Sequence, residues 1–245
     1  MVLRLNRPDK FNSFTRAMAM EMQQALDACA KDSVRAVVIT GNGKAFCAGQ
    51  DLQEVTGPDA PGFKTILSEG YNPIVSKIRA LKKPVVAAVN GVAAGAGANI
   101  ALCCDVVVAA SSASFIQAFS KIGLVPDSGG TFTLPRLIGF QKASALMMLG
   151  EKVSAAQAEQ LGMIYQVVDD AAFEEAWMSL ANTLAAMPTH GLALTKQLLN
   201  DTFTNTFDQQ LALEEKYQIE AGHTDDYREG VNAFVEKRKP VFTGK

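Results

Sequence analysis

AFCAGQDL, residues Ala45–Leu52, and NGVAAGAG, residues Asn90–Gly97, are two glycine-rich segments that each follow an apolar run. The first follows Val34–Thr40 and the second follows Pro84–Val89. Small residues let the backbone come close to a ligand, because no side chain stands in the way. Two such turns at the ends of neighbouring strands would aim two backbone N–H groups at one oxygen atom. The two segments therefore predict an oxyanion hole.

The stretch after the second segment predicts the charge of the ligand. Asn99–Cys104 is apolar and suits a buried helix. A helix beginning beside the second turn directs the positive end of its dipole at the same point. We therefore expect a ligand that develops negative charge on an oxygen atom.

The composition is that of an ordinary globular protein. The chain has 245 residues, of which 48% are hydrophobic and 20% charged, so it can bury a large core in one domain. The formal net charge is −2, and no basic run is interleaved with aromatic residues, so we expect no nucleic-acid partner. Asparagine and glycine residues interrupt the apolar stretch 85–102, which argues against a membrane span.

Cysteine use favours a cytoplasmic protein. The four cysteines show no Cys-x-x-Cys spacing, and adjacent Cys103 and Cys104 are poorly placed to pair with each other. We therefore expect reduced, mostly buried thiols. We also expect no signal peptide before the apolar stretch 85–102.

Strand and helix patterns alternate through the first part of the chain. Apolar runs predict strands at Val2–Leu5, Val34–Thr40, Pro84–Val89, Val106–Ala109 and Ile164–Val168. Helical spacing predicts helices at Thr15–Ala30, Phe63–Ala80 and Ala96–Cys103. This alternation favours an α/β fold with parallel strands joined by right-handed crossovers.

From Ser128 onward the chain is predicted to be mostly helical. Ser154–Gln157 has the pattern of a capping box that opens a helix ending near Gly162. Further apolar stripes predict helices at Ala171–Ala186, Gly191–Asn200, Phe207–Ala221 and Asp225–Lys237. Helices without intervening strands often form subunit contacts. We therefore divide the chain into a core, residues 1–187, and a helical region, residues 188–245.

Several familiar motifs are incomplete. Gly41–Gly43 and Gly95–Gly97 each begin a dinucleotide fingerprint, but Phe46 and Ile100 occupy the third glycine position, and no phosphate-binding Gly-Lys-Ser/Thr loop occurs. Ser128 lies in a segment similar to the nucleophile segment of trypsin-like proteases, yet both histidines, His190 and His223, lie in the helical tail. We therefore expect Ser128 in a turn or helix cap, and no metal site.

Five ordered motifs resemble those of the crotonase superfamily of acyl-CoA enzymes, from Leu5 to the C-terminus. They are LNRP (Leu5–Pro8), FCAGQDL (Phe46–Leu52), KPVVAAVNG (Lys83–Gly91), GLVPDSGG (Gly123–Gly130) and AFVEKR (Ala233–Arg238). The resemblance implies the crotonase fold of stacked βαβ units, with a helical C-terminal region that completes the CoA pocket and makes a trimer or a dimer of trimers. The superfamily usually has a further strand before the first motif, so we expect a chain that is trimmed or starts late.

The resemblance assigns the oxyanion hole to the backbone N–H groups of Gln50 and Ala96. Hydratases of the superfamily hold a water between two glutamates, and those positions are Asn99 and Phe119 here. Asn cannot exchange a proton near neutral pH and Phe cannot polarise water, so the hydratase mechanism lacks its acid and its base.

Asp127 occupies the position that several isomerases of the superfamily use as their single acid and base. From local sequence alone, Asp127 also fits the N-cap of the helix predicted near Ser128. A lone carboxylate facing a thioester enolate suits the transfer of one proton between two carbons. We therefore expect an isomerase with Asp127, Gln50 and Ala96 as its catalytic groups.

Further segments resemble the isomerase branch that converts the ring-1,2-epoxide of phenylacetyl-CoA to oxepin-CoA, with a related shift of 3-enoyl-CoA to 2-enoyl-CoA. They are EGYNPIV (Glu69–Val75), VAAGAGA (Val92–Ala98), FSKIGLVPD (Phe119–Asp127), DYREG (Asp226–Gly230) and FTGK (Phe242–Lys245). The resemblance implies no separate cofactor, because coenzyme A is part of the substrate, and other enzymes of phenylacetate catabolism as partners.

The resemblance also implies which residues contact the substrate. Around the two turns these are Ala48, Asp51, Leu52, Gly95, Gly97, Asn99 and Phe119. Phe119, Phe115 and Ala94 would line a pocket for an apolar ring, although core packing explains Phe115 equally well. Asp51 also suits a turn or helix cap.

Five charged or aromatic positions are candidates for the CoA moiety. Arg7 and Lys10, together with Lys44, could meet its phosphates, or each could be a solvated surface charge. Phe234 and Lys237 match positions that reach a neighbouring subunit's adenine pocket, although Phe234 also suits ordinary helix packing.

Two other functions stay open at this point: a hydratase-like lyase, and a non-catalytic homologue that binds CoA or RNA.

Overall fold

A five-stranded parallel sheet forms the centre of the computed structural model, which describes residues 1–56 and 60–245. Its strands are β1 (Val2–Leu5), β2 (Val37–Gly41), β4 (Val85–Val89), β6 (Val106–Ala110) and β9 (Gln166–Val168), in the order β1-β2-β4-β6-β9. Every residue of β2 and β4 is buried. Strands covered on both faces need continuous apolar runs, which is why these two were recognisable in the sequence.

A second sheet has four shorter strands, β3 (Ala45–Cys47), β5 (Val92–Ala94), β7 (Ser114–Ile116) and β8 (Lys152–Ser154). β3, β5 and β7 are parallel, and β8 is antiparallel to β7. The pairs β2 and β3, β4 and β5, and β6 and β7 each give one strand to each sheet. The end of β3 therefore lies beside the end of β5, which brings the two glycine-rich turns together. The sequence prediction missed this sheet, because three-residue strands are too short to show a period.

The first helices largely match the predicted ranges. α1 (Arg16–Ala28) begins after Thr15, whose side chain accepts a hydrogen bond from the Met18 N–H. The predicted helix Phe63–Ala80 is a continuous run of α2 (Phe63–Thr65), the π-helical η2 (Ile66–Tyr71) and α3 (Asn72–Ala80). α4 (Ala96–Leu102) begins directly after the second glycine-rich turn.

The next helices are α5 (Gly130–Ile138), α6 (Phe140–Leu149) and α7 (Ala155–Gln160), with short 3₁₀ turns η1 (Pro8–Lys10), η3 (Ala118–Ile122) and η4 (Asp170–Ala172). Of these helices, α5 packs on α4 and α6, and α7 lies against β7, β8 and β9. The predicted capping box of α7 is confirmed: Ser154 and Gln157 exchange side-chain and backbone hydrogen bonds.

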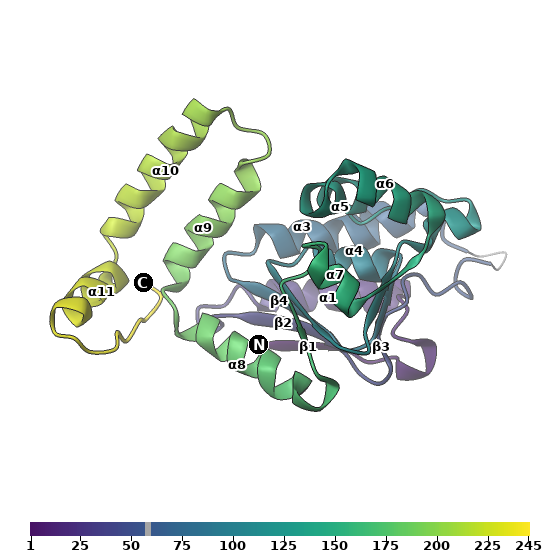
Figure 1. The fold of residues 1–245 in the computed structure, drawn as a ribbon, viewed down its shortest axis with the longest axis horizontal. Helices are drawn as coiled ribbons and strands as arrows, with labels where there is room; N and C mark the ends of the chain where they lie inside the picture. Colours follow the sequence, from purple (N-terminus) through teal and green to yellow (C-terminus); the bar gives the residue numbers. More distant parts are fainter. Residues whose placement is uncertain (57–59) are drawn as a thin grey trace.

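The C-terminal helices are α8 (Phe173–Ala186), α9 (Thr189–Asp201), α10 (Phe207–Gly222) and α11 (Asp225–Val235). α9 is fastened to the core by buried Lys196, whose Nζ lies 2.7 Å from the Ile78 carbonyl oxygen and 2.8 Å from Asp105 Oδ2. α10 and α11 stand apart from both sheets as an arm (Figure 1). The chain thus changes from a layered core to an arm of helices beyond α9.

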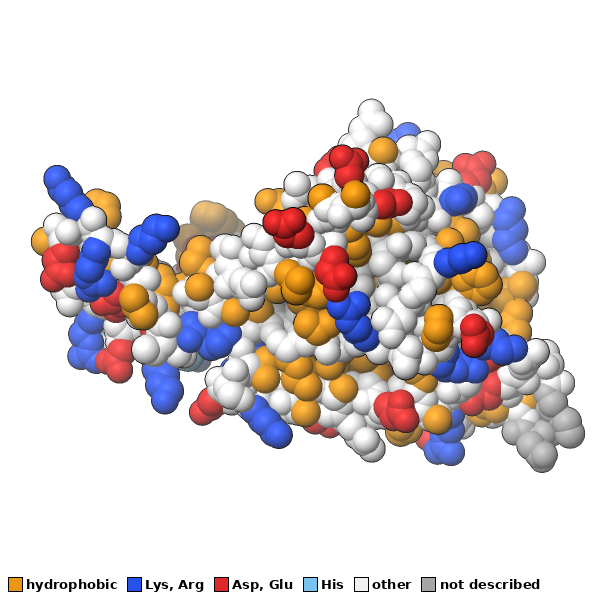
Figure 2. Space-filling model, turned by 90° about the horizontal axis from the view of Figure 1, so that it is seen from below, with side chains coloured by type: hydrophobic (Ala, Val, Ile, Leu, Met, Phe, Trp, Pro, Cys, Tyr) orange, Lys and Arg blue, Asp and Glu red, His pale blue; other side chains and the backbone are white. Residues whose placement is uncertain are grey.

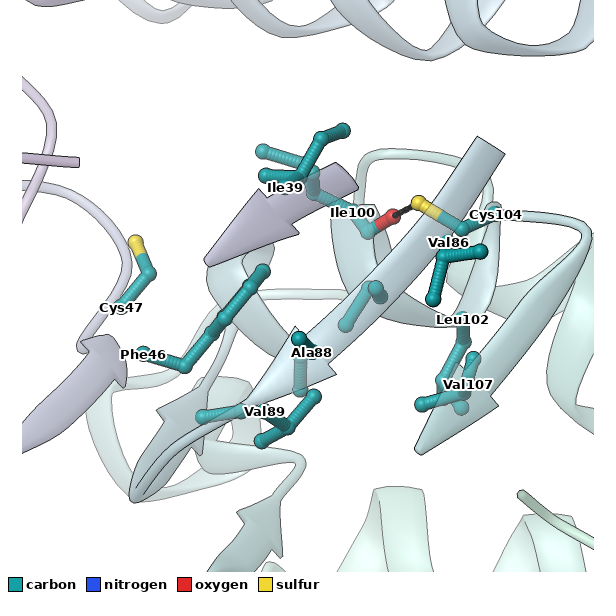
Figure 3. Close-up of a cluster of buried hydrophobic side chains, with 14 of the residues drawn as sticks. Ile39, Phe46, Cys47, Val86, Ala88, Val89, Ile100, Leu102, Cys104 and Val107 are labelled. Atoms are coloured by element: carbon teal, nitrogen blue, oxygen red, sulfur yellow. Dashed lines mark hydrogen bonds between the residues drawn. The ribbon is translucent and has the colours of Figure 1, made fainter. Parts of the chain in front are cut away.

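Apolar side chains from both sheets and from α4 meet in the core (Figure 3). Phe46 of β3 is fully buried with Ile39 of β2, and α4 packs closely on them. A Cβ at Gly97 would lie 2.3 Å from the Cys47 carbonyl oxygen, so glycine is what lets α4 approach β3. All four cysteines are buried free thiols, as predicted.

Among the described residues, every helix is too short or too polar to cross a membrane.

Candidate active site

The two glycine-rich turns touch each other at the ends of β3 and β5. Gly49 has φ +91° and Gly95 has φ +53°, a region of backbone conformation that favours glycine. A Cβ at Gly49 would lie 3.0 Å from the Ala94 carbonyl oxygen and 3.5 Å from the Ala96 nitrogen. Glycine at this position therefore allows the first turn to approach the Ala96 N–H.

The N–H groups of Gln50 and Ala96 make no hydrogen bond to any described residue. On the other edge of the first turn, Phe14 N–H donates to the Gly49 carbonyl at 2.7 Å, and Asp51 N–H donates to the Phe14 carbonyl at 2.9 Å. These bonds occupy the groups on either side of the Gln50 N–H. Gly95 N–H is likewise occupied, by the Ile116 carbonyl. Two unpaired donors on adjacent turns have the chemistry of an oxyanion hole.

The side chain of Gln50 is held at both ends. Tyr71 Oη donates to Gln50 Oε1 at 2.9 Å, and Gln50 Nε2 donates to Glu54 Oε2 at 3.0 Å. Burial raises the pKa of the Tyr71 hydroxyl, so it stays protonated and can donate. The Tyr71 ring packs edge-on against Phe14 at 5.7 Å. The sequence analysis missed this role of Tyr71, although π-helical turns such as η2 often occur at functional sites.

Asp127 lies half-buried in the loop between η3 and α5. Its Oδ1 accepts a hydrogen bond from Ser128 Oγ at 2.8 Å. Burial raises the pKa of the Asp127 carboxyl, and the Ser128 hydroxyl opposes that shift. The capping interpretation of Asp127 is wrong, because α5 begins at Gly130 after Gly129 and has no side-chain cap. Its carboxylate is therefore not used to hold a helix end.

Contacts of the Asp127 loop link it to the elements that carry the two glycine-rich turns. Asn99, one turn after Ala96 in α4, donates from Nδ2 to the Asp127 carbonyl oxygen at 2.9 Å. The Asp127 charge is also close enough to Tyr71 to raise the pKa of its hydroxyl. The loop is thus linked both to the helix that carries Ala96 and to the side chain that holds Gln50.

Phe119, Phe115 and Asn99, which were all predicted near the substrate, divide between site and core. The Phe119 ring lies 3.7 Å from where a Cβ of Gly95 would be, so it borders the second turn. Phe115 belongs to the hydrophobic core, which decides between its two interpretations. Asn99 is fully buried, with both amide atoms hydrogen-bonded inside the chain. Its contacts therefore differ from the predicted contacts with a substrate.

Arg7 and Asp51 pair with each other beside the first turn. Arg7 Nη2 lies 2.8 Å from Asp51 Oδ2, and Arg7 Nη1 donates to the Ser13 carbonyl at 2.6 Å. The Arg7 hydrogen bond is the main cause that lowers the pKa of Asp51. The Gln53 N–H also donates to Asp51 Oδ1. Asp51 therefore holds the turn, as its alternative interpretation predicted.

Most of the remaining predicted residues lie at the surface. Ala48, Leu52 and Lys10 are exposed near the first turn, and Lys10 Nζ donates to Gln53 Oε1. Gly97 is buried under Cys47, where it serves the packing of α4. Phe234 and Lys237 are exposed on the arm, away from both turns. One chain therefore places the turns of Gln50 and Ala96 side by side and ties the Asp127 loop to α4, whereas the arm residues lie away from them.

Comparisons with known proteins agree with this geometry. The whole chain, residues 1–245, matches the model of the enoyl-CoA hydratase/isomerase family. It is 50% identical to the 1,2-epoxyphenylacetyl-CoA isomerase of Escherichia coli K12, covering 100% of this chain and 95% of the relative. It is 45% identical to a "probable enoyl-CoA hydratase" of Rhodobacter capsulatus, over 100% and 94%.

A solved structure from Mycobacterium abscessus, described as an enoyl-CoA hydratase/isomerase, superposes with a TM-score of 0.94. The two chains are 37% identical, with 100% of this chain and 95% of the other covered. The match confirms the predicted crotonase fold. This chain belongs to the enoyl-CoA hydratase/isomerase family.

Proposed function

We propose that this protein is an acyl-CoA isomerase that uses Asp127 as its single acid and base. The observation that carries the proposal is the half-buried carboxylate of Asp127, which does not cap a helix. Asn99 ties the Asp127 loop to the helix that carries Ala96. The positions at which hydratases of the family hold two glutamates are Asn99 and Phe119. Neither side chain can activate water for addition to a double bond.

The proposed reaction moves one proton and conserves all atoms. The Asp127 carboxylate removes a proton from the carbon next to the thioester carbonyl, and the electron pair moves onto the carbonyl oxygen. The N–H groups of Gln50 and Ala96 hold this enolate oxygen. Protonated Asp127 then returns the proton to another carbon of the acyl group, which restores the carbonyl and shifts the double bond.

The substrate proposed first is the ring-1,2-epoxide of phenylacetyl-CoA, with oxepin-CoA as the product. In this substrate the C–C bond shared by the epoxide and the six-membered ring also breaks, in an electrocyclic opening whose electron pairs form the double bonds of the seven-membered ring. Both C–O bonds remain, and no further reactant is needed. The 50% identical relative is named for this substrate, and Phe119 places an aromatic side chain beside the second turn. A shift of 3-enoyl-CoA to 2-enoyl-CoA needs the same proton transfer and is the second substrate class. Coenzyme A then enters as part of the substrate, with no separate cofactor.

We further propose that the arm completes the site in a neighbouring copy of the chain. Phe234 is 85% exposed, and α10 and α11 carry further exposed apolar side chains, including Phe207, Ile219 and Val231. On the face shown in Figure 2, the arm at the left bears hydrophobic side chains among charges of both signs. A trimer or a dimer of trimers would cover them, and Phe234 with Lys237 would then meet the CoA moiety. Arg7 and Lys10 stay candidates for its phosphates.

The decisive assay compares three substrates with the purified protein. We expect turnover of the phenylacetyl-CoA epoxide, slower turnover of 3-hexenoyl-CoA, and almost no hydration of crotonyl-CoA. Robust hydration of crotonyl-CoA by the wild type would refute the isomerase assignment. CoA binding without any turnover would instead support a non-catalytic role.

A further inference from the structure

Asn99 joins the two halves of the proposed site through its side-chain amide. Its Nδ2 donates to the Asp127 carbonyl oxygen at 2.9 Å, and its Oδ1 accepts from Gln117 Nε2 at 2.7 Å. Asn99 lies three residues after Ala96, so both are on the same side of the first turn of α4. The helix that presents one oxyanion N–H therefore also carries the amide that holds the Asp127 loop.

The bonding partners fix the orientation of both amides. A backbone carbonyl oxygen can only accept, so the Asn99 atom that faces Asp127 must be the nitrogen. Asn99 Oδ1 then faces Gln117, and the Gln117 atom that meets it must be Nε2. The donors run in one direction, from Gln117 through Asn99 to the residue that carries the carboxylate.

Close packing leaves the Asn99 amide no room to move. Asn99 is 0% exposed, and a Cβ at Gly130 would lie 2.3 Å from its Nδ2. The Gly130 N–H donates to the same Asp127 carbonyl oxygen at 2.8 Å. The Asp127 carbonyl oxygen thus accepts two hydrogen bonds, and only glycine fits at position 130 beside them. This arrangement is a rigid support for the loop.

The hydrogen bond from Gln117 to Asn99 comes with an energetic cost at the other end of the Gln117 amide. Its side chain is buried, and among the described residues its Oε1 has no hydrogen-bond partner. A buried acceptor without a partner costs about 1–3 kcal/mol. An apolar side chain at position 117 would instead leave the buried Asn99 Oδ1 without its donor, so the glutamine is what satisfies and orients the Asn99 amide.

We propose that Asn99, oriented by Gln117, is a positioning residue that fixes the Asp127 carboxylate relative to the Ala96 N–H. The proposal rests on the proposed function, because it assumes that Asp127 transfers the proton. A displacement of about 1 Å at a reacting group can cost on the order of 10²-fold in rate. Asn99 thus acts on the rate through Asp127, without contact with the substrate.

The principal variant is Asn99→Leu, which has a similar volume and makes no hydrogen bond. We expect kcat to fall by about 10- to 10²-fold, with KM little changed, since the substrate contacts remain. Gln117→Met should lower kcat less. The double variant should be no slower than Asn99→Leu alone, because Gln117 acts through Asn99.

Two further variants separate positioning from general damage. In the Asp127→Asn background, Asn99→Leu should not lower the residual rate further. Asn200→Leu is the matched control: Asn200 also accepts from one side chain and donates to one backbone carbonyl, both of Arg79, between α9 and α3. It should keep the wild-type kcat per folded molecule. Should Asn99→Leu fail to fold, Gln117→Met carries the same comparison.

An NMR titration of the Asp127 carboxyl, assigned by its loss in Asp127→Asn, gives a readout that needs no turnover. Loosening the loop should expose the carboxyl and move its pKa toward the ordinary aspartate value. A folded Asn99→Leu with unchanged kcat and unchanged titration would overturn the proposal, as would an equal loss of rate in the Asp127→Asn background. A wild type without turnover would refute the proposed function, and the titration would then decide on Asn99 by itself.

Discussion

At the scale of single residues, two opposing effects act on the Asp127 carboxyl. Burial raises its pKa, and the hydrogen bond from Ser128 lowers it, with burial the larger cause. A base with a raised pKa binds a proton more readily, which suits a group that must take a proton and return it. The same burial makes the ionised carboxylate unfavourable in the folded protein.

We expect Asp127→Asn to raise the free energy of unfolding at pH 7. Because the folded-state pKa of Asp127 is raised above its unfolded value of about 3.9, the folded protein binds this proton more tightly. The free energy of unfolding therefore falls as the pH rises from the unfolded pKa to the folded one. The neutral side chain of Asn avoids this loss. Near pH 3 the Asp127 carboxyl of the wild type is protonated in the folded and in the unfolded protein, so the advantage of the variant disappears.

Thermal unfolding of both proteins at pH 7 and near pH 3 measures the effect. Asp127→Asn should gain stability relative to the wild type only at the higher pH. A relative stability independent of pH would show that burial does not disfavour the Asp127 charge.

At the scale of elements, the site depends on short strands that end in glycine turns. The unpaired N–H of Ala96 is the first of α4, and glycine at position 97 lets that helix lie against β3. The position of the donor is thus set by backbone packing, and side chains contribute to it only indirectly.

Ala96→Pro tests the donor itself. Proline removes the N–H and suits the first turn of a helix, so the fold should survive. Loss of one oxyanion donor costs about 3 kcal/mol of transition-state stabilisation, or on the order of 10²–10³ in rate. Circular dichroism and sizing should look normal while turnover collapses. Full activity of the folded variant would mean that the thioester oxygen is not held at Ala96.

Gly97→Ala tests the packing of α4 on β3. Its Cβ would lie 2.3 Å from the Cys47 carbonyl oxygen, which is backbone and cannot turn aside. We expect a loss of about 1–3 kcal/mol in the free energy of unfolding, typical of overpacking. Gly222→Ala in α10 is the control, because its Cβ would meet nothing within 4 Å. Denaturant unfolding of both variants makes the comparison, and equal stabilities would contradict this account of α4.

At the scale of the whole molecule, the arm exposes apolar side chains that a single chain does not cover. Phe234 is 85% exposed and Phe207 is 75% exposed, on α11 and α10. The arm is fastened to the core through α9 and the Lys196 contacts. An arm held at its base and apolar beyond it fits the proposed contact with another copy.

Phe234→Ala should raise KM for the acyl-CoA substrate several-fold and leave kcat unchanged. A higher KM with an unchanged kcat is expected when the lost contact stabilises the bound substrate and the transition state equally. Phe207→Ala removes a similarly exposed ring from the same arm and should leave KM unchanged. If both variants raised KM equally, the cause would be a weakened assembly of the chains and not the loss of a contact with CoA. Sizing of both proteins would show such a loss of assembly.

The sequence predicted the parts of the fold that repeat over many residues. Long buried strands such as β4 and helices such as α1 show their period, and the capping box marked the start of α7. The small sheet was missed, because its strands have three residues and are specified by partners far along the chain.

The candidate site was predictable where chemistry depends on residue type. Glycine turns pointed to free N–H groups, and the resemblance pointed to Asp127. The support of the site was not predictable, because Tyr71 and Gln117 act through single long-range hydrogen bonds. Arg7 and Asp51 were predicted separately as substrate contacts, and only the fold reveals that they pair with each other.

The most direct test of the central claim is the turnover of the phenylacetyl-CoA epoxide, or of 3-hexenoyl-CoA, by Asp127→Asn. Asn keeps the size of the side chain and can still accept a hydrogen bond from Ser128, but it cannot carry a proton. We predict an intact fold and unchanged CoA affinity, with kcat lower by about 10²–10⁴-fold, the usual contribution of general acid–base catalysis. Near-normal kcat in the folded variant would remove Asp127 from the mechanism.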